Sequence, residues 1–150
     1  MQYRQLGNAC VRVSVIGLGG NRLGTDALTQ DGVNDIVAAC ADVGINFIDT
    51  ANVYNGGKSE ERLGIALKGR WDKFVVATKF SMPTGDGPND KGASRYHLLN
   101  ALDASLRRLQ SDHVDLYYAH RWDAQTPIEE TLRALDDMVR AGKVRQDIFN

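Results

Sequence analysis

The chain has 150 residues, of which 43% are hydrophobic and 25% charged, and a formal net charge of −1, values that are typical of one globular domain. The near-neutral charge argues against binding of nucleic acid or an anionic membrane, since both need a basic patch. Two distant cysteines, Cys10 and Cys40, argue against a disulfide framework. No signal-peptide pattern or apolar run of ~18 residues is visible, so we expect a cytoplasmic protein.

Apolar periodicity divides the chain into alternating strands and helices. Short apolar runs predict strands, and apolar residues spaced three and four apart predict helices. In chain order the sequence predicts a hairpin over 3–14, strands over 13–20, 45–49, 74–78 and 114–119, and helices over 31–43, 59–67, 94–109 and 126–142. The segment 81–93 is predicted to be a long polar loop, and 143–150 is ambiguous.

Four local signals mark the ends of these helices. Gly44 is predicted to end the first helix, and Ser59 and Ser94 to begin the second and third as N-caps. Thr126-Pro127-Ile128-Glu129 reads as a capping box with proline at the first helical position of the fourth helix. Acidic residues Glu60 and Glu61 fall in the first turn of the second helix, where the helix dipole favours them.

The order is a hairpin followed by four strand–helix units, which predicts an α/β fold with a parallel sheet and right-handed crossovers. The pattern alone leaves open whether the sheet is flat or curls into a barrel wall. No linker or internal repeat is visible, so residues 1–150 are predicted to form a single domain.

Three consecutive predicted strands end in chemically active residues, namely Asp49, Lys79 and His120, and Tyr54 follows the first of them closely. Strand carboxyl ends lie on one side of a parallel α/β fold, so we expect these four groups to converge. A single polar residue at a strand end is usually a helix cap or a solvated loop residue. Three in succession beside a tyrosine favour a functional site.

The four residue types suit carbonyl reduction. A lysine beside a phenol stabilises phenolate, and a carboxylate keeps that lysine charged and in place. A neutral histidine can donate a hydrogen bond to a carbonyl oxygen. Together such groups protonate an oxygen that gains negative charge during hydride transfer. None of them donates hydride, so a nicotinamide cofactor is implied.

Two other cofactor motifs are weaker. Gly17-Leu18-Gly19-Gly20-Asn21-Arg22 has Arg22 where a Rossmann G-x-G-x-x-G fingerprint needs glycine. Tyr54 and Lys58 form a Tyr-x-x-x-Lys pair that other dehydrogenases place on a helix, but here two glycines separate them in a predicted loop.

A metal site is not predicted. His97, His113 and the two cysteines lack ligand spacing, and both histidines are expected at the surface or at helix ends. Trp122 comes two residues after His120, and it is expected either in the core or lining a substrate pocket.

At these residues the chain resembles the aldo-keto reductases, in the branch that includes bacterial reductases and potassium-channel β subunits. The matching segments, which cover Tyr3 to Arg145, are VSVIGLGG, GINFIDTANVYNGGKSEERLG, FVVATKF, the leucine-rich third helix, VDLYYAHRWD and TPIEETLRALDDMVRAGKVR. The family's catalytic tetrad corresponds to Asp49, Tyr54, Lys79 and His120.

The resemblance implies reduction of aldehydes or ketones with NADPH on a (β/α)8 TIM barrel, with Tyr54 as general acid. Gly20, Asn21 and Asp49 match positions near the nicotinamide.

A barrel of this type usually takes ~250 residues, so the resemblance covers only the first four βα units and an N-terminal hairpin, the N-terminal half. In the family, most contacts to the pyrophosphate and adenosine lie in the other half. After Arg145 the sequence of this chain departs from the family's pattern. We therefore expect impaired activity alone and association with itself or with a complementary half-barrel. The alternatives are a non-catalytic binding or regulatory module of the channel β-subunit type and an inactive truncated product.

Overall fold

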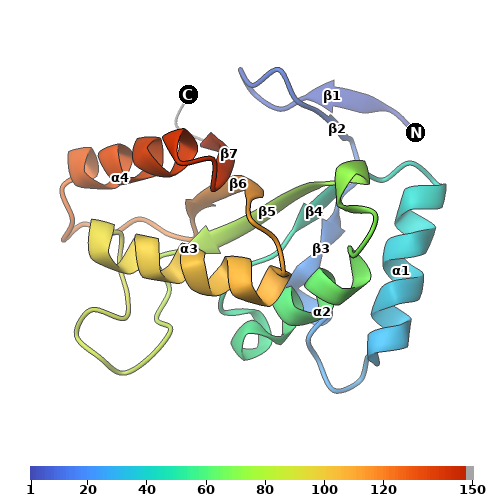
Figure 1. Ribbon diagram of the computed structural model, residues 1–150, viewed down its shortest axis with the longest axis horizontal. Coiled ribbons are helices and arrows are strands. Elements are labelled where there is room, and N and C mark those ends of the chain that lie inside the picture. The colour runs from blue at the N-terminus through green and yellow to red at the C-terminus, as the bar shows by residue number, and fades with distance from the viewer. Residues whose placement is uncertain (148–150) are drawn as a thin grey trace.

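The computed structural model describes residues 1–147, which form a two-stranded hairpin and a five-stranded parallel sheet with helices (Figure 1). The hairpin pairs β1 (Tyr3–Gln5) with β2 (Arg12–Ser14) in antiparallel register. Each strand of the sheet lies beside its successor in the chain. The sheet strands are β3 (Leu18–Gly19), β4 (Phe47–Asp49), β5 (Val75–Phe80), β6 (Val114–Ala119) and β7 (Val144–Asp147).

Four helices connect consecutive sheet strands, so the predicted strand–helix alternation is confirmed. They are α1 (Gln30–Asp42), α2 (Lys58–Ala66), α3 (Arg95–Leu109) and α4 (Ile128–Arg140). Because parallel neighbours are joined by right-handed crossovers, the four helices cover the same face of the sheet (Figure 1). Short 3-10 helices lie in the connections: η1 (Gly20–Arg22), η2 (Tyr54–Gly57) and η3 (Trp71–Lys73). Among residues 1–147, no helix is long and apolar enough to cross a membrane.

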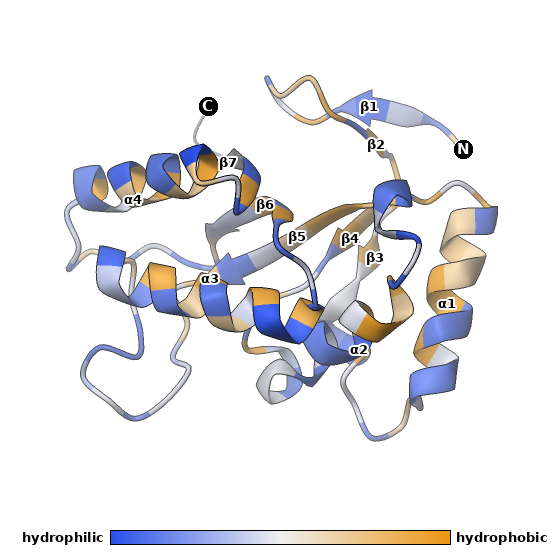
Figure 2. Cartoon of the chain, viewed as in Figure 1, coloured by the Kyte–Doolittle hydropathy of each residue, from blue (hydrophilic) through white to orange (hydrophobic). Residues whose placement is uncertain are grey.

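The core lies between the sheet and the helices. Figure 2 shows hydrophobic strands in the sheet, and α3 and α4 with both hydrophobic and hydrophilic sides. Each buried leucine or isoleucine contributes about 1.5–3 kcal/mol through removal of apolar surface from water. The fully buried side chains include Ile48, Leu63, Phe80, Leu98, Leu102, Tyr117 and Leu135.

The hairpin docks where β4 begins. Asn46, just before β4, accepts a hydrogen bond from the Ser14 backbone N–H at 2.7 Å and donates from its side-chain amide to the Arg12 carbonyl at 3.0 Å. Tyr3 donates its hydroxyl hydrogen to the Gly44 carbonyl at 2.9 Å. The hairpin therefore occupies the amino end of the sheet, and the carboxyl ends of the strands are left for other groups.

Two of the predicted helix ends are confirmed. The Ser94 hydroxyl accepts a hydrogen bond from the His97 backbone N–H at 3.2 Å and caps α3. Gly44 follows the end of α1 with a φ of +81°, a left-handed conformation that glycine adopts without the penalty of a Cβ atom.

The predicted N-cap of α2 is wrong. The helix begins at Lys58 after Gly57, which has a φ of +94°, and Ser59 lies inside the first turn. The Ser59 hydroxyl instead donates to the Gly20 carbonyl at 2.7 Å. The Ser59 hydroxyl, predicted to cap α2, thus binds the carbonyl of a residue far away in the sequence.

The predicted capping box of α4 is also wrong. Helical residues begin at Ile128, Pro127 is the N-cap residue, and no side chain caps the helix. The Thr126 hydroxyl instead donates to Asp123 at 2.8 Å, a charge-assisted hydrogen bond that holds this side chain within the preceding loop.

The strands differ from prediction in four places. The strand predicted over 45–49 forms only from Phe47 to Asp49 in β4. The predicted strand 13–20 enters the sheet only at Leu18–Gly19, since the Ser14 hydroxyl binds the Ile16 carbonyl and turns the chain after β2. The strand predicted over 74–78 runs on to Phe80 in β5. The ambiguous segment adds β7, a fifth parallel strand beside β6, whose Val144 is buried in the core. Residues 148–150 lie outside the described residues.

Candidate active site

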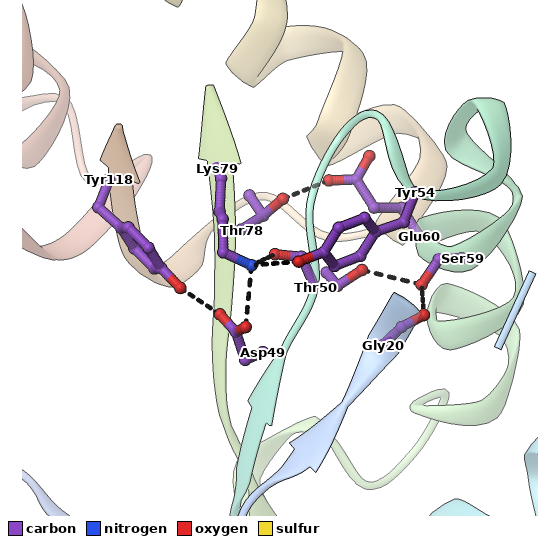
Figure 3. Close-up of polar contacts among 9 residues, drawn as sticks. All are labelled: Gly20, Asp49, Thr50, Tyr54, Ser59, Glu60, Thr78, Lys79 and Tyr118. Carbon is purple, nitrogen blue, oxygen red and sulfur yellow. Dashed lines mark hydrogen bonds and ion pairs between the residues drawn. The ribbon is translucent and has the colours of Figure 1, made fainter. Parts of the chain in front are cut away.

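Lys79 is the centre of a hydrogen-bonded cluster at the carboxyl end of the sheet. It lies one residue before the end of β5, and its side chain is 7% exposed. Its ammonium nitrogen donates to Asp49 Oδ2 at 2.9 Å, to the Thr50 carbonyl at 2.7 Å and to the Tyr54 hydroxyl at 3.2 Å (Figure 3). An ammonium group has three donors, so each of them has a partner, and the buried charge is both paired and hydrogen-bonded.

Asp49, the last residue of β4, uses both of its carboxylate oxygens. Oδ2 accepts from Lys79, and Oδ1 accepts from the hydroxyl of Tyr118 (Figure 3). Burial raises the pKa of Tyr118, and its hydrogen bond to Asp49 raises that pKa further. Tyr118 therefore stays neutral and donates its proton to the carboxylate.

Tyr118 was not among the site residues predicted from the sequence. Lys79 and Tyr118 are directly paired across β5 and β6, and paired residues point to the same face of a sheet. Aligning the predicted strands 74–78 and 114–119 at their carboxyl ends would have paired Lys79 with His120, because β5 runs two residues further than predicted. The neighbour of the lysine therefore followed only from the observed register.

Tyr54 reaches the lysine from the connection between β4 and α2. The next three residues, Asn55, Gly56 and Gly57, have positive φ values of 54°, 65° and 94°. These values turn the chain sharply into α2. The Tyr54 ring centroid lies 4.8 Å from the Lys79 nitrogen. Because the Tyr54 oxygen accepts from Lys79, its own hydrogen remains free to point toward a ligand.

His120 follows β6 directly and completes the group from a third strand. Its ring meets the Tyr54 ring edge to face, with centroids 5.7 Å apart and planes at 87°. Burial lowers the pKa of His120, and the charge of Lys79 lowers it further. The imidazole is therefore neutral near pH 7, and its buried Nδ1 has no hydrogen-bond partner among residues 1–147.

Gly20 and Asn21 lie in η1, after β3. Gly20 is buried, and its carbonyl accepts from Ser59. A Cβ atom at Gly20 would stand 2.8 Å from the Thr50 hydroxyl and 3.0 Å from that of Ser59, so only glycine permits this packing. Asn21 directly follows Gly20 and is exposed.

Trp122 is 69% exposed and does not belong to the core. It lines a groove of about 510 Å³ between the loop after β5 and the loop after β6. The predicted core position is therefore wrong, and the prediction that Trp122 lines a substrate pocket stays a prediction.

Behind the cluster, a buried ion pair joins α2, β5 and α3. Glu60 is fully buried, accepts from the Thr78 hydroxyl at 2.5 Å and accepts from Arg108 at 2.7 Å (Figure 3 shows Glu60 and Thr78). Glu60 was predicted to lie in the first turn of α2, where the helix dipole favours a negative charge. In the structure its carboxylate fixes the strand that carries Lys79.

The cluster combines an ammonium group, a phenol with a free hydrogen and a neutral imidazole. Such a set can donate a proton to a substrate oxygen on which negative charge develops, with the ammonium group stabilising the phenolate left behind. None of these side chains can give up a hydride, so a reduction here needs a separate hydride donor.

Comparison with known proteins gives a consistent result. Residues 15–146 match the sequence model of the Aldo/keto reductase family. The chain is 42% identical over 145 residues to a probable voltage-gated potassium channel subunit beta from Oryza sativa subsp. japonica, covering 95% of this chain and 44% of that protein. It is 39% identical over 156 residues to the Bacillus subtilis (strain 168) oxidoreductase YrpG, covering 96% of this chain and 47% of that protein.

Two solved structures share the fold. Aldo-keto reductase AKR11C1 from Bacillus halodurans, in its holo form, has a TM-score of 0.88 and 36% identity, covering 98% of this chain and 49% of that one. The thermostable aldo-keto reductase Tm1743, in complex with the inhibitor epalrestat, has a TM-score of 0.84 and 32% identity, covering 98% of this chain and 53% of that one. The chain thus has the fold of about half a TIM barrel, and it spans about half the length of the curated relatives it matches.

Proposed function

This chain belongs to the aldo/keto reductase family, and from that premise we propose that it supplies the acid–base half of an oxidoreductase that reduces aldehydes or ketones with NADPH. On this proposal residues 1–150 are one domain, the N-terminal half of the barrel. The observation that carries the proposal is the hydrogen bond of 3.2 Å from the buried Lys79 ammonium group to the Tyr54 hydroxyl.

The four side chains have separate roles in the proposed reaction. Tyr54 donates its hydroxyl proton to the carbonyl oxygen as that oxygen becomes an alkoxide. Lys79 stabilises the resulting phenolate through its positive charge. Asp49 holds the ammonium group at 2.9 Å, and the neutral His120 orients the carbonyl oxygen by a hydrogen bond.

The nicotinamide cofactor would supply the hydride. Three observations support a place for its nicotinamide end here: Asn21 is exposed, the Asp49 carboxylate is partly exposed, and a side chain would not fit at Gly20. We assign Gly20, Asn21 and Asp49 to that end. The small carbonyl substrate would enter from the groove that Trp122 lines.

The test compares two tyrosine variants in the native assembly that contains this chain, with an aromatic aldehyde as substrate and NADPH oxidation as the readout. Tyr54→Phe removes the proton donor and should lower turnover by about a hundredfold or more. Tyr96→Phe makes the same chemical change on exposed α3 and should leave turnover unchanged. Undiminished activity of Tyr54→Phe would refute the assignment.

The open sheet suggests that the lone chain needs a partner. The terminal strands β3 and β7 each have one neighbour in the described sheet, and unpaired strand edges favour association. We propose that the chain pairs with itself or with a complementary half-barrel, and that alone it turns over weakly. A compact monomer that unfolds cooperatively at micromolar concentration, observed by sedimentation and urea titration, would contradict this.

A second function is a non-catalytic module of the channel β-subunit kind. The observation that favours it is the identity of 42% and 41% to two plant proteins named as probable channel β subunits. A binding role does not need the Tyr54 proton. Capture of a channel segment by wild type and Tyr54→Phe alike, without turnover by either, would support this function over the reductase.

A further inference from the structure

The groove beside Trp122 is formed by residues that follow Lys79 and His120 in the chain. It lies between the loop after β5 and the loop after β6, and has a volume of about 510 Å³. Ser81, at one wall, is two residues beyond Lys79, and Arg121, at the other, directly follows His120. The cluster residues themselves do not line the groove, so a molecule with its reactive oxygen at the cluster reaches it by extending past Ser81 and Arg121.

The two loops that form the groove are tied together. The Ser81 hydroxyl donates to the Arg121 carbonyl at 3.0 Å and accepts from the Arg121 backbone N–H at 3.1 Å. The Ser81 carbonyl accepts from the Gly92 N–H at 3.0 Å. Ser81 has a φ of +85°, a left-handed conformation that costs a non-glycine residue about 1–3 kcal/mol and tends to occur at ligand sites. The groove is thus built in advance of any ligand.

The acidic residue of the groove, Asp123, is already engaged. Its Oδ2 accepts from the Ala93 N–H and the Thr126 hydroxyl, each at 2.8 Å, and its Oδ1 accepts from the Gln125 N–H at 3.0 Å. These hydrogen bonds lower the pKa of Asp123. Its negative charge is stabilised by its own loops.

Unlike Asp123, whose charge is held by its own loops, the two cationic side chains of the groove have no salt-bridge partner among residues 1–147. Lys91 and Arg121 are both exposed and line it, and neither forms a salt bridge within residues 1–147. The positive charge of Arg121 also helps to lower the pKa of Asp123, so this guanidinium lies near the groove's own carboxylate. Trp122 adds a flat, exposed apolar wall next to Arg121.

We propose that this groove recognises a carboxylate on the substrate, so that the substrate class is a carbonyl compound with a carboxylate at its far end and an apolar body that packs on Trp122. A guanidinium group binds carboxylate in a planar, two-point geometry, and Lys91 adds a second positive charge. This assignment rests on the proposed function for the direction in which the substrate lies. The groove itself can be tested without turnover.

The test measures binding of benzoate and of its neutral analogue benzamide to the full chain, by tryptophan fluorescence at low salt. Trp122→Phe identifies the signal, because the chain's other tryptophan is Trp71. We expect benzoate to bind about tenfold more tightly than benzamide, an advantage that falls as salt is added. Equal affinities, or no measurable binding of benzoate, would overturn the proposal.

Three substitutions locate the binding charge. Arg121→Gln and Lys91→Gln should each weaken benzoate binding about three- to tenfold and leave benzamide binding unchanged. Arg107→Gln removes an exposed cation from α3 instead and should change neither. Urea unfolding verifies that each variant folds, and the exposed Lys91 gives a decisive result even if Arg121→Gln unfolds. Undiminished benzoate binding in either variant, once that variant is shown to be folded, would overturn the proposal.

A fourth variant separates this proposal from the proposed function. Tyr54→Phe should bind benzoate like wild type, since Tyr54 is outside the groove. If wild type reduces the aldehyde but binds benzoate no more tightly than benzamide, only the carboxylate site is refuted. If wild type prefers benzoate but does not reduce the aldehyde, only the proposed reductase function is refuted.

Discussion

The Tyr118 hydroxyl donates a hydrogen bond to the Asp49 carboxylate, on the oxygen that Lys79 does not contact. Two phenols therefore flank the Lys79 ammonium group, but they differ in where their protons go. The Tyr118 proton is held by the carboxylate. The Tyr54 oxygen accepts from Lys79, which leaves the Tyr54 proton free for a substrate. The hydrogen-bond directions thus distinguish the two tyrosines.

Replacing Tyr118 by phenylalanine should impair turnover without removing the proton donor. The free Asp49 oxygen would let the carboxylate rotate and displace Lys79, so we expect kcat to fall about tenfold with KM little changed. The matched control is Tyr117→Phe, since that buried hydroxyl donates only to the Leu98 carbonyl. Each change should cost about 1 kcal/mol of unfolding free energy, but only Tyr118→Phe should lower kcat. Equal kcat values for both variants would contradict this.

Glu60→Gln should destabilise the chain strongly. Glu60 is fully buried, and removing its charge leaves Arg108 without a counter-ion at a site that is 23% exposed. We expect a loss of about 3 kcal/mol in the free energy of unfolding, measured by urea titration. Glu61→Gln changes the adjacent, exposed carboxylate and should stay within about 0.5 kcal/mol of wild type. Similar losses from the two variants would show that the buried pair contributes little.

Gly20→Ala should disturb the rim more than Gly19→Ala. A Cβ at Gly20 would lie 2.8 Å from the Thr50 hydroxyl, whereas one at Gly19 would meet nothing within 4 Å. We expect Gly20→Ala to cost about 1–3 kcal/mol of unfolding free energy through overpacking and to weaken NADPH binding, read by fluorescence titration of the native assembly. A tolerated Gly20→Ala would mean that η1 can shift away from Thr50 at low cost.

Stability should depend on pH through His120. Its pKa is lowered by burial and then by Lys79, so near pH 6 the unfolded chain binds a proton more readily than the folded chain does. The folded state therefore keeps its stability above the unfolded pKa of about 6.5 and loses stability as pH falls through the lower folded pKa.

Urea midpoints measured between about pH 7 and pH 5 test this dependence. They should fall in wild type and fall less in His120→Gln. His97→Gln should also reduce the fall, because burial lowers the pKa of His97. A decline that is the same in wild type and in both variants would exclude these histidines as its source.

The sequence by itself determined the order of the strands and helices and the residues at their carboxyl ends. Apolar runs and helical spacing are local properties, so the strand–helix alternation and the Ser94 and Gly44 helix ends were correctly predicted. The alternation predicts a parallel sheet. Because the carboxyl ends of parallel strands lie at one edge of the sheet, Asp49, Lys79 and His120 are predicted to lie there together.

Only the tertiary structure decided which partners each polar group has. Ser59 and Thr126 bind distant or loop acceptors instead of capping their helices, and Tyr118 meets Asp49 from 69 residues away. A side chain's partner depends on the register of strands and the approach of loops that are far apart in the chain. Local sequence patterns do not encode those distances. Four residues of the site could therefore be predicted from the sequence, whereas Tyr118 and the hydrogen bonds among these residues could not.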